Sequence, residues 1–446
     1  MKKENYPDLN YEILLKPCGD PFVDAGGFVL KKLSEENPKL GVLDLIDYAA
    51  NIYVKEWGSK INEFFLNSKI TNPNVKEYKK DKTKNYFLDL LNNKFYLEEK
   101  LYHPVEGFCR ITGIKTKLFP ARRDNSCLTG SGKFVNFSHH FEPGLMVSKE
   151  VLIKYFFLPL ASEQLLGKIA VINSNNVDIS RFYAEKCWEK IKSNLSSGLL
   201  KNKAQAIGTA IFRFLDSVFT EFKGNITLYL FTNFADKPSL DIYTLPLKTF
   251  YFYRETRKKE YREKWDSFVK SKYYKQKMFY DFEEKCYKNE NGTEEYRESE
   301  FEYWQNSIYD KLLKELTILP DICKWSKEHP FDIELLKCYL INLRDMKKET
   351  INKINQIAEY ILSDENNIKK RTEDLNGFNN SSELRRFIVK LIKENYERGN
   401  SNPLVTVNEY VNCLFPDSSI WMELRDILLI SIYQKLHERG IKINNN

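Results

Sequence analysis

The pattern of apolar residues changes near residue 300, and this change constrains the fold more than any other feature of the chain. Beyond that point the strand signal disappears and apolar residues recur every three to four positions. Three such stripes are Ile351, Ile354, Ile357, Ala358 and Ile361; Leu384, Phe387, Ile388, Leu391 and Ile392; and Trp421, Leu424, Leu428 and Ile432. Ser381 or Ser382 can cap the middle helix. Residues 301–446 are therefore predicted to form an α-helical bundle.

Residues 1–300 instead mix strand and helix patterns. Strands are predicted at Tyr11–Leu15, in GKIAVINSNN at 167–176, at Ile226–Phe234 and at Leu247–Tyr253. Helical spacing marks Val42–Phe65, Tyr86–Tyr96, Ile179–Ile191 and Ala204–Phe222. Glu283–Glu300 is polar and is the best candidate for a linker. The predicted fold class is α+β, with a mixed α/β domain over residues 1–300 and the helical bundle over 301–446.

Composition excludes some classes of protein. The first ten residues, MKKENYPDLN, lack the apolar core of a signal peptide, and the most apolar run, Val151–Ala161, is short and interrupted by Lys154. Eight cysteines without a CxxC pair are typical of a reducing compartment. We therefore expect a cytoplasmic protein with no membrane partner.

The segment Cys109–Phe137, CRITGIKTKLFPARRDNSCLTGSGKFVNF, shows neither helical nor strand periodicity. It contains six Lys or Arg residues together with four Gly or Pro residues, so we expect a structured loop that approaches a phosphate backbone. GSGK at 130–133 is not a P-loop, because Cys127 and Phe134 occupy the positions that require Gly and Ser or Thr.

No motif predicts a metal centre or cofactor. Cys109 and Cys127 could join His139 and His140 around zinc, but structural zinc sites normally use close CxxC-type pairs, and each of these cysteines stands alone. Two ordinary buried thiols are the simpler interpretation, and we expect neither metal nor cofactor.

Asp20 and Asp24 carry the alternative hypothesis of an enzyme. On a helix, their spacing of four would align two carboxylates for a metal-dependent nuclease. Pro21 and the Gly26–Gly27 pair instead predict a turn, in which Asp20 caps the turn and Asp24 caps the helix that follows. We favour capping.

Two other segments concentrate positive charge. Arg254–Lys277 mixes Lys and Arg with Tyr and Trp, and Arg254, Arg257, Lys258 and Lys259 are candidates for contact with a nucleic-acid backbone. Arg386, Lys390 and Lys393 stand opposite an apolar stripe at spacings of four and three. A solvated helix face explains either set equally well, and a helical scaffold with a solubilising basic face remains a further alternative.

Four stretches together resemble a known family. They are GDPFVDAGG at 19–27, the segment Cys109–Phe137, GKIAVINSNN at 167–176 and WMELRDILLISIYQKL at 421–436. In this order they are similar to the large subunit of the type I-B CRISPR Cascade complex, in the branch named for its CxxC-CxxC region. The chain departs from that pattern, because CRITG stands where CxxCG is expected and no cysteine lies near residues 144–148.

The resemblance implies a non-enzymatic subunit that works in antiviral defence. Such a subunit recognises the protospacer-adjacent motif (PAM) of target double-stranded DNA, aids duplex opening and R-loop formation, and helps recruit a separate helicase-nuclease. Its partners are crRNA and the other Cascade subunits: the backbone, the cap of the crRNA 5′ end and the small subunits. The helical C-terminal region resembles that small subunit.

The resemblance also directs attention to side chains of the basic loop. The candidate DNA contacts are Arg122, Arg123, Lys133 and Asn136, with Asn125 and Ser131 as secondary candidates. Arg and Lys would neutralise phosphates or enter a narrow minor groove, and Asn would read acceptors on base edges. Each side chain also has an ordinary explanation as a surface charge or a turn-forming residue.

Overall fold

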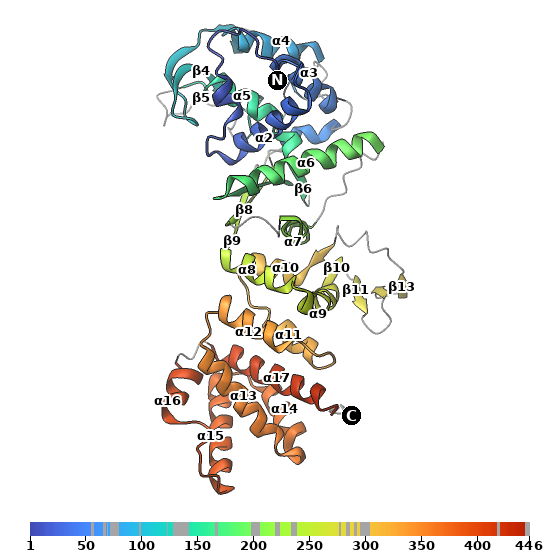
Figure 1. Cartoon of the computed structure of the whole chain (residues 1–446), viewed down its shortest axis with the longest axis vertical. Helices are drawn as coiled ribbons and strands as arrows, with labels where there is room; N and C mark the ends of the chain where they lie inside the picture. The colour runs from blue at the N-terminus through green and yellow to red at the C-terminus, as the bar shows by residue number, and fades with distance from the viewer. Residues whose placement is uncertain are drawn as a thin grey trace. The chain divides into compact units, whose positions relative to one another are not determined.

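The structure is a computed structural model that describes residues 1–54, 58–65, 68, 70–71, 80–97, 100–122, 124–127, 142–165, 168–197, 206–218, 224–232, 239–275, 278–281, 286–289, 292–294, 304–416 and 420–441. The fold class is α+β, as predicted. The chain divides into two compact units, Met1–Leu245 and Pro246–Asn446, whereas the sequence predicted domains that meet after residue 300. In Figure 1 the mixed first unit runs from blue to green, and the helical end of the second unit runs from orange to red.

The first unit alternates helices with short strands. Its helices are α1 (Tyr11–Leu15), α2 (Pro21–Glu36), α3 (Val42–Ile52), α4 (Lys80–Leu91), α5 (Lys149–Phe157), α6 (Val177–Ser197) and α7 (Ile207–Val218), with 3₁₀ turns η2 (Gly58–Glu63) and η4 (Leu158–Ala161). Its strands are β1 (Phe95–Leu97), β2 (Lys100–Tyr102), β3 (Val105–Phe108), β4 (Lys115–Ala121), β5 (Leu145–Val147), β6 (Glu163–Leu165), β7 (Lys168–Ser174), β8 (Ile226–Thr232) and β9 (Ser239–Leu245).

Tyr11–Leu15 forms α1, so the strand predicted there is wrong. The Asn10 side chain accepts hydrogen bonds from the backbone N–H groups of Glu12 at 2.9 Å and Ile13 at 3.1 Å, and so caps the helix. A five-residue segment with four apolar or aromatic side chains fits a strand and a short helix equally well, and the cap decides between them.

The Gly26–Gly27 pair lies inside α2, where the sequence predicted a turn. A β-carbon on Gly26 would stand 2.0 Å from the carbonyl oxygen of Lys154, and one on Gly27 would stand 3.2 Å from Cδ of the same lysine. Pro21 occupies the first helical turn, where its missing N–H is not needed. The turn prediction is wrong because the two glycines allow α2 to approach α5 closely, and do not reverse the chain.

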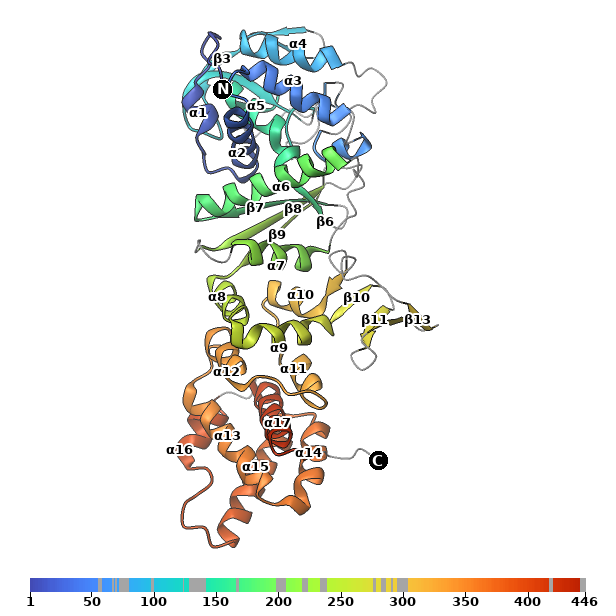
Figure 2. The same cartoon turned by 45° about the vertical axis from the view of Figure 1, so that its right-hand side comes forward.

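An antiparallel sheet in the order β6-β7-β8-β9 forms the lower part of the first unit in Figure 2. β7 and β8 confirm the strands predicted at 167–176 and Ile226–Phe234, and their register pairs Val171 with Tyr229. β9 was not predicted. It is an edge strand whose alternate residues, including Leu240 and Ile242, are exposed, and its mixture of Ser, Asp and Thr weakens the strand pattern.

The predicted strand Leu247–Tyr253 is wrong, because these residues belong to helix α8 (Leu247–Thr256) of the second unit. Thr249, Phe252, Tyr253 and Thr256 are buried and recur at i, i+3, i+4 and i+7. The aromatic and β-branched composition favours a strand, but the spacing of the buried residues is helical.

The second unit contains a small sheet and a series of helices. After α8 come α9 (Lys259–Lys270), α10 (Ser307–Leu313), α11 (Leu319–Ser326), α12 (Ile333–Asn342), α13 (Lys348–Leu362), α14 (Ile368–Gly377), α15 (Ser381–Glu397), α16 (Val407–Glu409), the π-helical segment η7 (Tyr410–Leu414) and α17 (Trp421–Glu438), with a short 3₁₀ turn at Glu365–Asn367. The sheet has the order β13-β12-β11-β10-β14, from β10 (Tyr273–Lys275), β11 (Met278–Asp281), β12 (Cys286–Asn289), β13 (Gly292–Glu294) and β14 (Gln305–Asn306). Glu283–Glu300 was predicted as a linker, yet it supplies β12 and β13 to this sheet.

Helix α17 is the centre of the helical region. It packs against α11, α13, α14 and α15, which surround it in both Figure 1 and Figure 2. Its residues are buried on every side from Ile427 to Tyr433, as expected for a helix at the centre of a bundle. The predicted stripe of α13 is entirely buried, which confirms it. The cap of α15 is Asn380, which accepts the N–H of Glu383, so neither Ser381 nor Ser382 is the cap.

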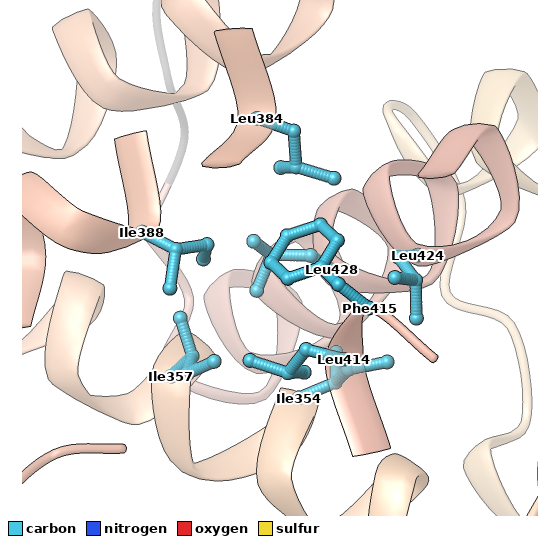
Figure 3. Close-up of a pocket in the computed structure, with 8 residues that line it drawn as sticks. All are labelled: Ile354, Ile357, Leu384, Ile388, Leu414, Phe415, Leu424 and Leu428. Atoms are coloured by element: carbon cyan, nitrogen blue, oxygen red, sulfur yellow. The ribbon is translucent and has the colours of Figure 1, made fainter. Parts of the chain in front are cut away.

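Figure 3 shows a small void where four elements of this bundle meet. Its lining is entirely aliphatic or aromatic: Ile354, Ile357, Leu384, Ile388, Leu414, Phe415, Leu424 and Leu428. The void measures only about 10 Å³, which corresponds to about one water-sized sphere. It is a packing imperfection of the core and is too small for a ligand.

Within the described residues, no helix combines the length and the apolar character needed to cross a membrane.

Candidate nucleic-acid interface

The two ends of the basic loop are mounted on neighbouring strands. β4 pairs with β5 in antiparallel register, with Ala121 opposite Leu145, so residues 122–144 leave and rejoin the sheet at adjacent positions. The prediction that Cys109–Phe137 contains no strand is wrong, because Lys115–Ala121 forms β4. Arg123, Ser131, Lys133 and Asn136 lie outside the described residues, as do His139 and His140. The structure therefore describes the base of the loop.

Asn125 holds the beginning of the loop in place. Its carboxamide oxygen accepts the N–H of Arg122 at 2.7 Å, and its amide nitrogen donates to the carbonyl of Pro120 at 3.1 Å and the hydroxyl of Tyr86 at 3.0 Å. The Asn125 side chain is buried, whereas Arg122 is half-buried. Asn125 therefore faces the protein here and not a base edge, and Arg122 leads the chain out of the sheet.

The return end of the loop is equally constrained. Gly144 passes so close to the start that a β-carbon on it would lie 2.6 Å from the carbonyl oxygen of Ala121. Glu142 accepts a hydrogen bond from the Arg110 guanidinium at 2.8 Å, which ties the returning chain to the turn after β3. Both described ends of the loop are thus held in place by contacts with the sheet and with the turn after β3.

The turn after β3 is organised around the thiol of Cys109. The Cys109 sulfur accepts the N–H groups of Thr112 at 3.4 Å and Ser148 at 3.3 Å, while Gly113, at φ 68°, donates its N–H to the Cys109 carbonyl at 2.8 Å. Arg110 donates its N–H to the carbonyl of Met146 at 3.0 Å. The fold therefore brings CRITG and residues 144–148 side by side, which the sequence alone did not show.

The described residues do not assemble a metal site. They contain no group of three or more His, Cys, Asp or Glu side chains placed to hold an ion. Cys109 and Cys127 are both buried, and burial raises the pKa of the Cys127 thiol well above its ordinary value. Thr112 and Ser148, not cysteines, complete the surroundings of the Cys109 sulfur through their backbone N–H groups.

Helix α5 carries two buried lysines, whose role the sequence did not reveal. Lys149 donates to the carbonyl oxygens of Pro7 at 2.8 Å and Leu91 at 2.9 Å, and Lys154 donates to that of Lys16 at 2.5 Å. Burial lowers the pKa of Lys149 to about 8. The only sequence signal was the interruption of an apolar run by Lys154, because the carbonyl partners come from distant segments.

Asp20 and Asp24 both bind backbone N–H groups. Asp20 caps α2 by accepting from Phe22 at 3.0 Å and Val23 at 2.9 Å. Asp24 does not cap a following helix as predicted, because it lies in the first turn of α2 and accepts from Cys18 at 2.7 Å and Gly19 at 2.8 Å. Asp20 therefore caps the helix, the role predicted for Asp24, while Asp24 holds the loop that precedes α2.

The cations of α8 and α9 are largely neutralised by their neighbours. Arg257 donates to Asp266 through its two terminal guanidinium nitrogens at 2.5 and 3.2 Å, and Lys258 lies 2.5 Å from Glu255. Arg254 and Lys259 are exposed. A groove of about 600 Å³ runs along this side of α9, and its described lining includes Glu263 and Asp266 beside four basic residues.

The cations of α15 differ, because Arg386, Lys390 and Lys393 project from the face opposite the buried stripe. The side chains of Lys390 and Lys393 are 67% and 73% exposed, and their nearest carboxylates are Glu394 at 4.0 Å and Glu397 at 3.5 Å. Such exposed pairs contribute little to stability. This row therefore keeps most of its positive potential.

Comparison with known proteins covers part of the second unit. A family model described as the DevT C-terminal domain matches residues 324–446. The matched region begins in α11 and includes α12 to α17. No curated protein and no solved structure matches the chain.

Proposed function

We propose that this chain is the large, DNA-binding subunit of a type I-B CRISPR surveillance complex in the cytoplasm. In this role it binds the PAM region of target double-stranded DNA and aids duplex opening, and a helicase-nuclease recruited in trans cuts the DNA. The chain itself is not an enzyme. Guide RNA pairing supplies most of the sequence recognition, so the protein need only read a short motif and hold strands.

The observation that carries the proposal is the mounting of the basic, glycine-containing loop. Long excursions between adjacent strands of a rigid sheet are commonly functional, because the sheet fixes where they begin and end. Here Asn125 holds the departure, while Gly144 and the Arg110–Glu142 pair hold the return. Arg122 is half-buried at the start of the loop, and Arg123, Lys133 and Asn136 follow it in the sequence as the proposed DNA contacts, with Ser131 between them.

The surroundings of Cys109 add independent support. The resemblance places two cysteine pairs at CRITG and near residues 144–148, and these two segments are neighbours through the hydrogen bond from Ser148 to the Cys109 sulfur. Backbone N–H groups directed at a sulfur replace the metal as the connection between them. This arrangement fits a loop that has kept its position without zinc.

The decisive experiment removes the loop charges from the assembled complex. Arg122, Arg123 and Lys133 are replaced together by Ala, and binding to a target duplex is measured over a range of salt concentrations. Loss of three phosphate contacts should lower the slope of log K against log salt by about 2 to 3. Co-purification with guide RNA and the other subunits should stay unchanged.

A charge-matched control uses three exposed lysines of the same unit, Lys2, Lys39 and Lys94, also replaced by Ala. This variant should keep the wild-type slope. Equal slopes for wild type and the loop variant would refute the loop assignment, and failure of the wild-type chain to co-purify with a short guide RNA would refute the complex itself.

A further inference from the structure

The outward face of α15 combines cations with an unusually exposed aromatic side chain. Arg386, Lys390 and Lys393 follow one line along the helix, and Val389 and Tyr396 lie along one side of that line at a spacing of seven. Tyr396 is 81% exposed and Val389 is 53% exposed. A solubilising helix face needs the cations but gains nothing from a tyrosine ring in water.

We infer that this face binds single-stranded nucleic acid, with Tyr396 stacking against an unpaired base. The inference deepens the proposed function by adding a second site for a different form of nucleic acid. Seven residues of helix rise about 10 Å, so the three cations form a row of about that length that can follow the phosphates of one strand. Exposed aromatic rings bind bases without regard to sequence, because every base offers a flat face.

The acidic residues of α15 leave this row available. Glu394 is directed to Arg371 at 2.6 Å on the inner side of the helix, where Asp364 binds the same guanidinium at 3.1 Å. On the outer side, Glu397 lies 3.5 Å from Lys393, and the second carboxylate oxygen of Glu394 lies 4.0 Å from Lys390. The helix therefore uses its best-placed carboxylate to hold α14 and leaves its outer face basic.

A duplex is a poorer ligand for this face than a single strand. Base pairing and stacking hide the faces of the bases inside a duplex, so Tyr396 would gain a partner only from unpaired nucleotides. An acidic peptide would be attracted to the cations, but it offers no flat ring face to the tyrosine. Stacking on Tyr396 therefore distinguishes a single strand from a duplex and from an acidic peptide.

The test measures binding of the full-length chain to a labelled oligothymidine by fluorescence anisotropy. Replacing Arg386, Lys390 and Lys393 together by Ala should lower the salt slope by about 2, from roughly 0.7 per contact with a single strand. Tyr396→Ala should weaken binding about fivefold or more, and Tyr396→Phe should bind as wild type does. The charge-matched control replaces exposed Lys347, Lys348 and Lys370 and should have no such effect.

A second oligonucleotide of the same length carries abasic sites in place of its bases. The triple variant should weaken binding to both oligonucleotides, whereas Tyr396→Ala should matter only when bases are present. Equal losses for both, or competition by polyglutamate as strong as that by oligothymidine, would overturn the inference. So would a triple variant that behaves like the lysine control.

The outcome of the α15 experiment can be interpreted independently of the outcome of the loop experiment. If the loop variant loses duplex binding while the α15 variant still binds oligothymidine normally, the α15 inference is overturned. The proposed function then still stands. Weaker oligothymidine binding by the α15 variant, beside a loop variant that binds duplex normally, would support α15 and refute the loop.

Discussion

Helices α9 and α15 are both rich in Lys and Arg, yet an acid on each helix is used differently. On α9, Asp266 holds Arg257, the C-cap residue of α8, whose side chain is only 14% exposed. Lys264 of α9 binds Asp332 at 2.7 Å. On α15, the acid that best fits this role, Glu394, faces inward to Arg371, and the outward cations keep only loose partners.

The number of cations on a helix therefore does not predict what the helix binds. A cation that is already hydrogen-bonded to a carboxylate must lose that partner before it can bind a phosphate. A cation with a partner at 4.0 Å and high exposure loses almost nothing. Placement of the acids, not of the bases, separates a structural charge from an available one.

The largest expected effect comes from the inner partner of α15. Arg371 is buried and forms ion pairs with Asp364 and Glu394. Arg371→Ala removes the guanidinium partner of both carboxylates and should destabilise the second unit by about 3 kcal/mol. Denaturant unfolding followed by circular dichroism measures this. Arg386→Ala on the outer face of α15 should change the unfolding free energy by less than about 0.5 kcal/mol. Equal effects of the two substitutions would remove the distinction between inner and outer charges.

Lys149, a buried lysine of the first unit, should make the stability of the protein depend on pH. Burial lowers the pKa of Lys149 to about 8 in the folded chain, from an ordinary value of 10.5. Between these two values the unfolded chain binds more protons, so this group makes the folded state more stable as pH rises from 8 to 10.5. Below pH 8 its destabilising contribution is complete.

Lys149→Met tests this sign. The difference in unfolding free energy between wild type and the variant should change in favour of wild type as pH increases over that range. A difference that stays constant from pH 7 to pH 10.5 would show that Lys149 titrates normally and is not held within the core.

The smallest effect is expected from Arg257, the cation that Asp266 of α9 holds. Arg257→Ala loses the two hydrogen bonds to Asp266 and the contact with the Tyr253 ring, and should cost about 1 kcal/mol of stability. Binding of oligothymidine should be unchanged, since the guanidinium already has a carboxylate partner. Reduced binding with unchanged stability would reverse the roles assigned to α9 and α15.

Sequence patterns predicted helices and strands correctly where the residues of the element itself determine its structure. The stripe Ile351 to Ile361 was predicted from periodicity, because burial of one side repeats at the period of the helix, and the strand Ile226–Phe234 from its β-branched and aromatic residues. The errors fall where a single residue or a distant neighbour decides. Asn10 converts Tyr11–Leu15 into a helix, and Lys154 explains a glycine pair that reads as a turn.

The candidate site was only partly accessible to sequence reasoning. The concentration of charge and glycine in Cys109–Phe137 identified a loop, but it did not show that β4 and β5 hold its two ends. Asn is a residue type that can read base edges, so the sequence made Asn125 a candidate DNA contact. Its side chain instead donates to the hydroxyl of Tyr86, which lies far away in the sequence, and to the carbonyl of Pro120. Tyr396 went unnoticed because one tyrosine among 27 carries no signal until its exposure is known.

The α+β class, the helical character of the C-terminal region and the places where positive charge gathers were all predictable from the sequence, since each depends on residues close together in the chain. The sequence could not show which charges are neutralised, which glycines serve packing, or how Cys109 comes to lie beside Ser148. These features depend on folding, because hydrogen bonds and ion pairs act over a few ångströms of space. Whether Glu394 faces Arg371 or solvent depends on how the helices pack, and no local pattern contains that information.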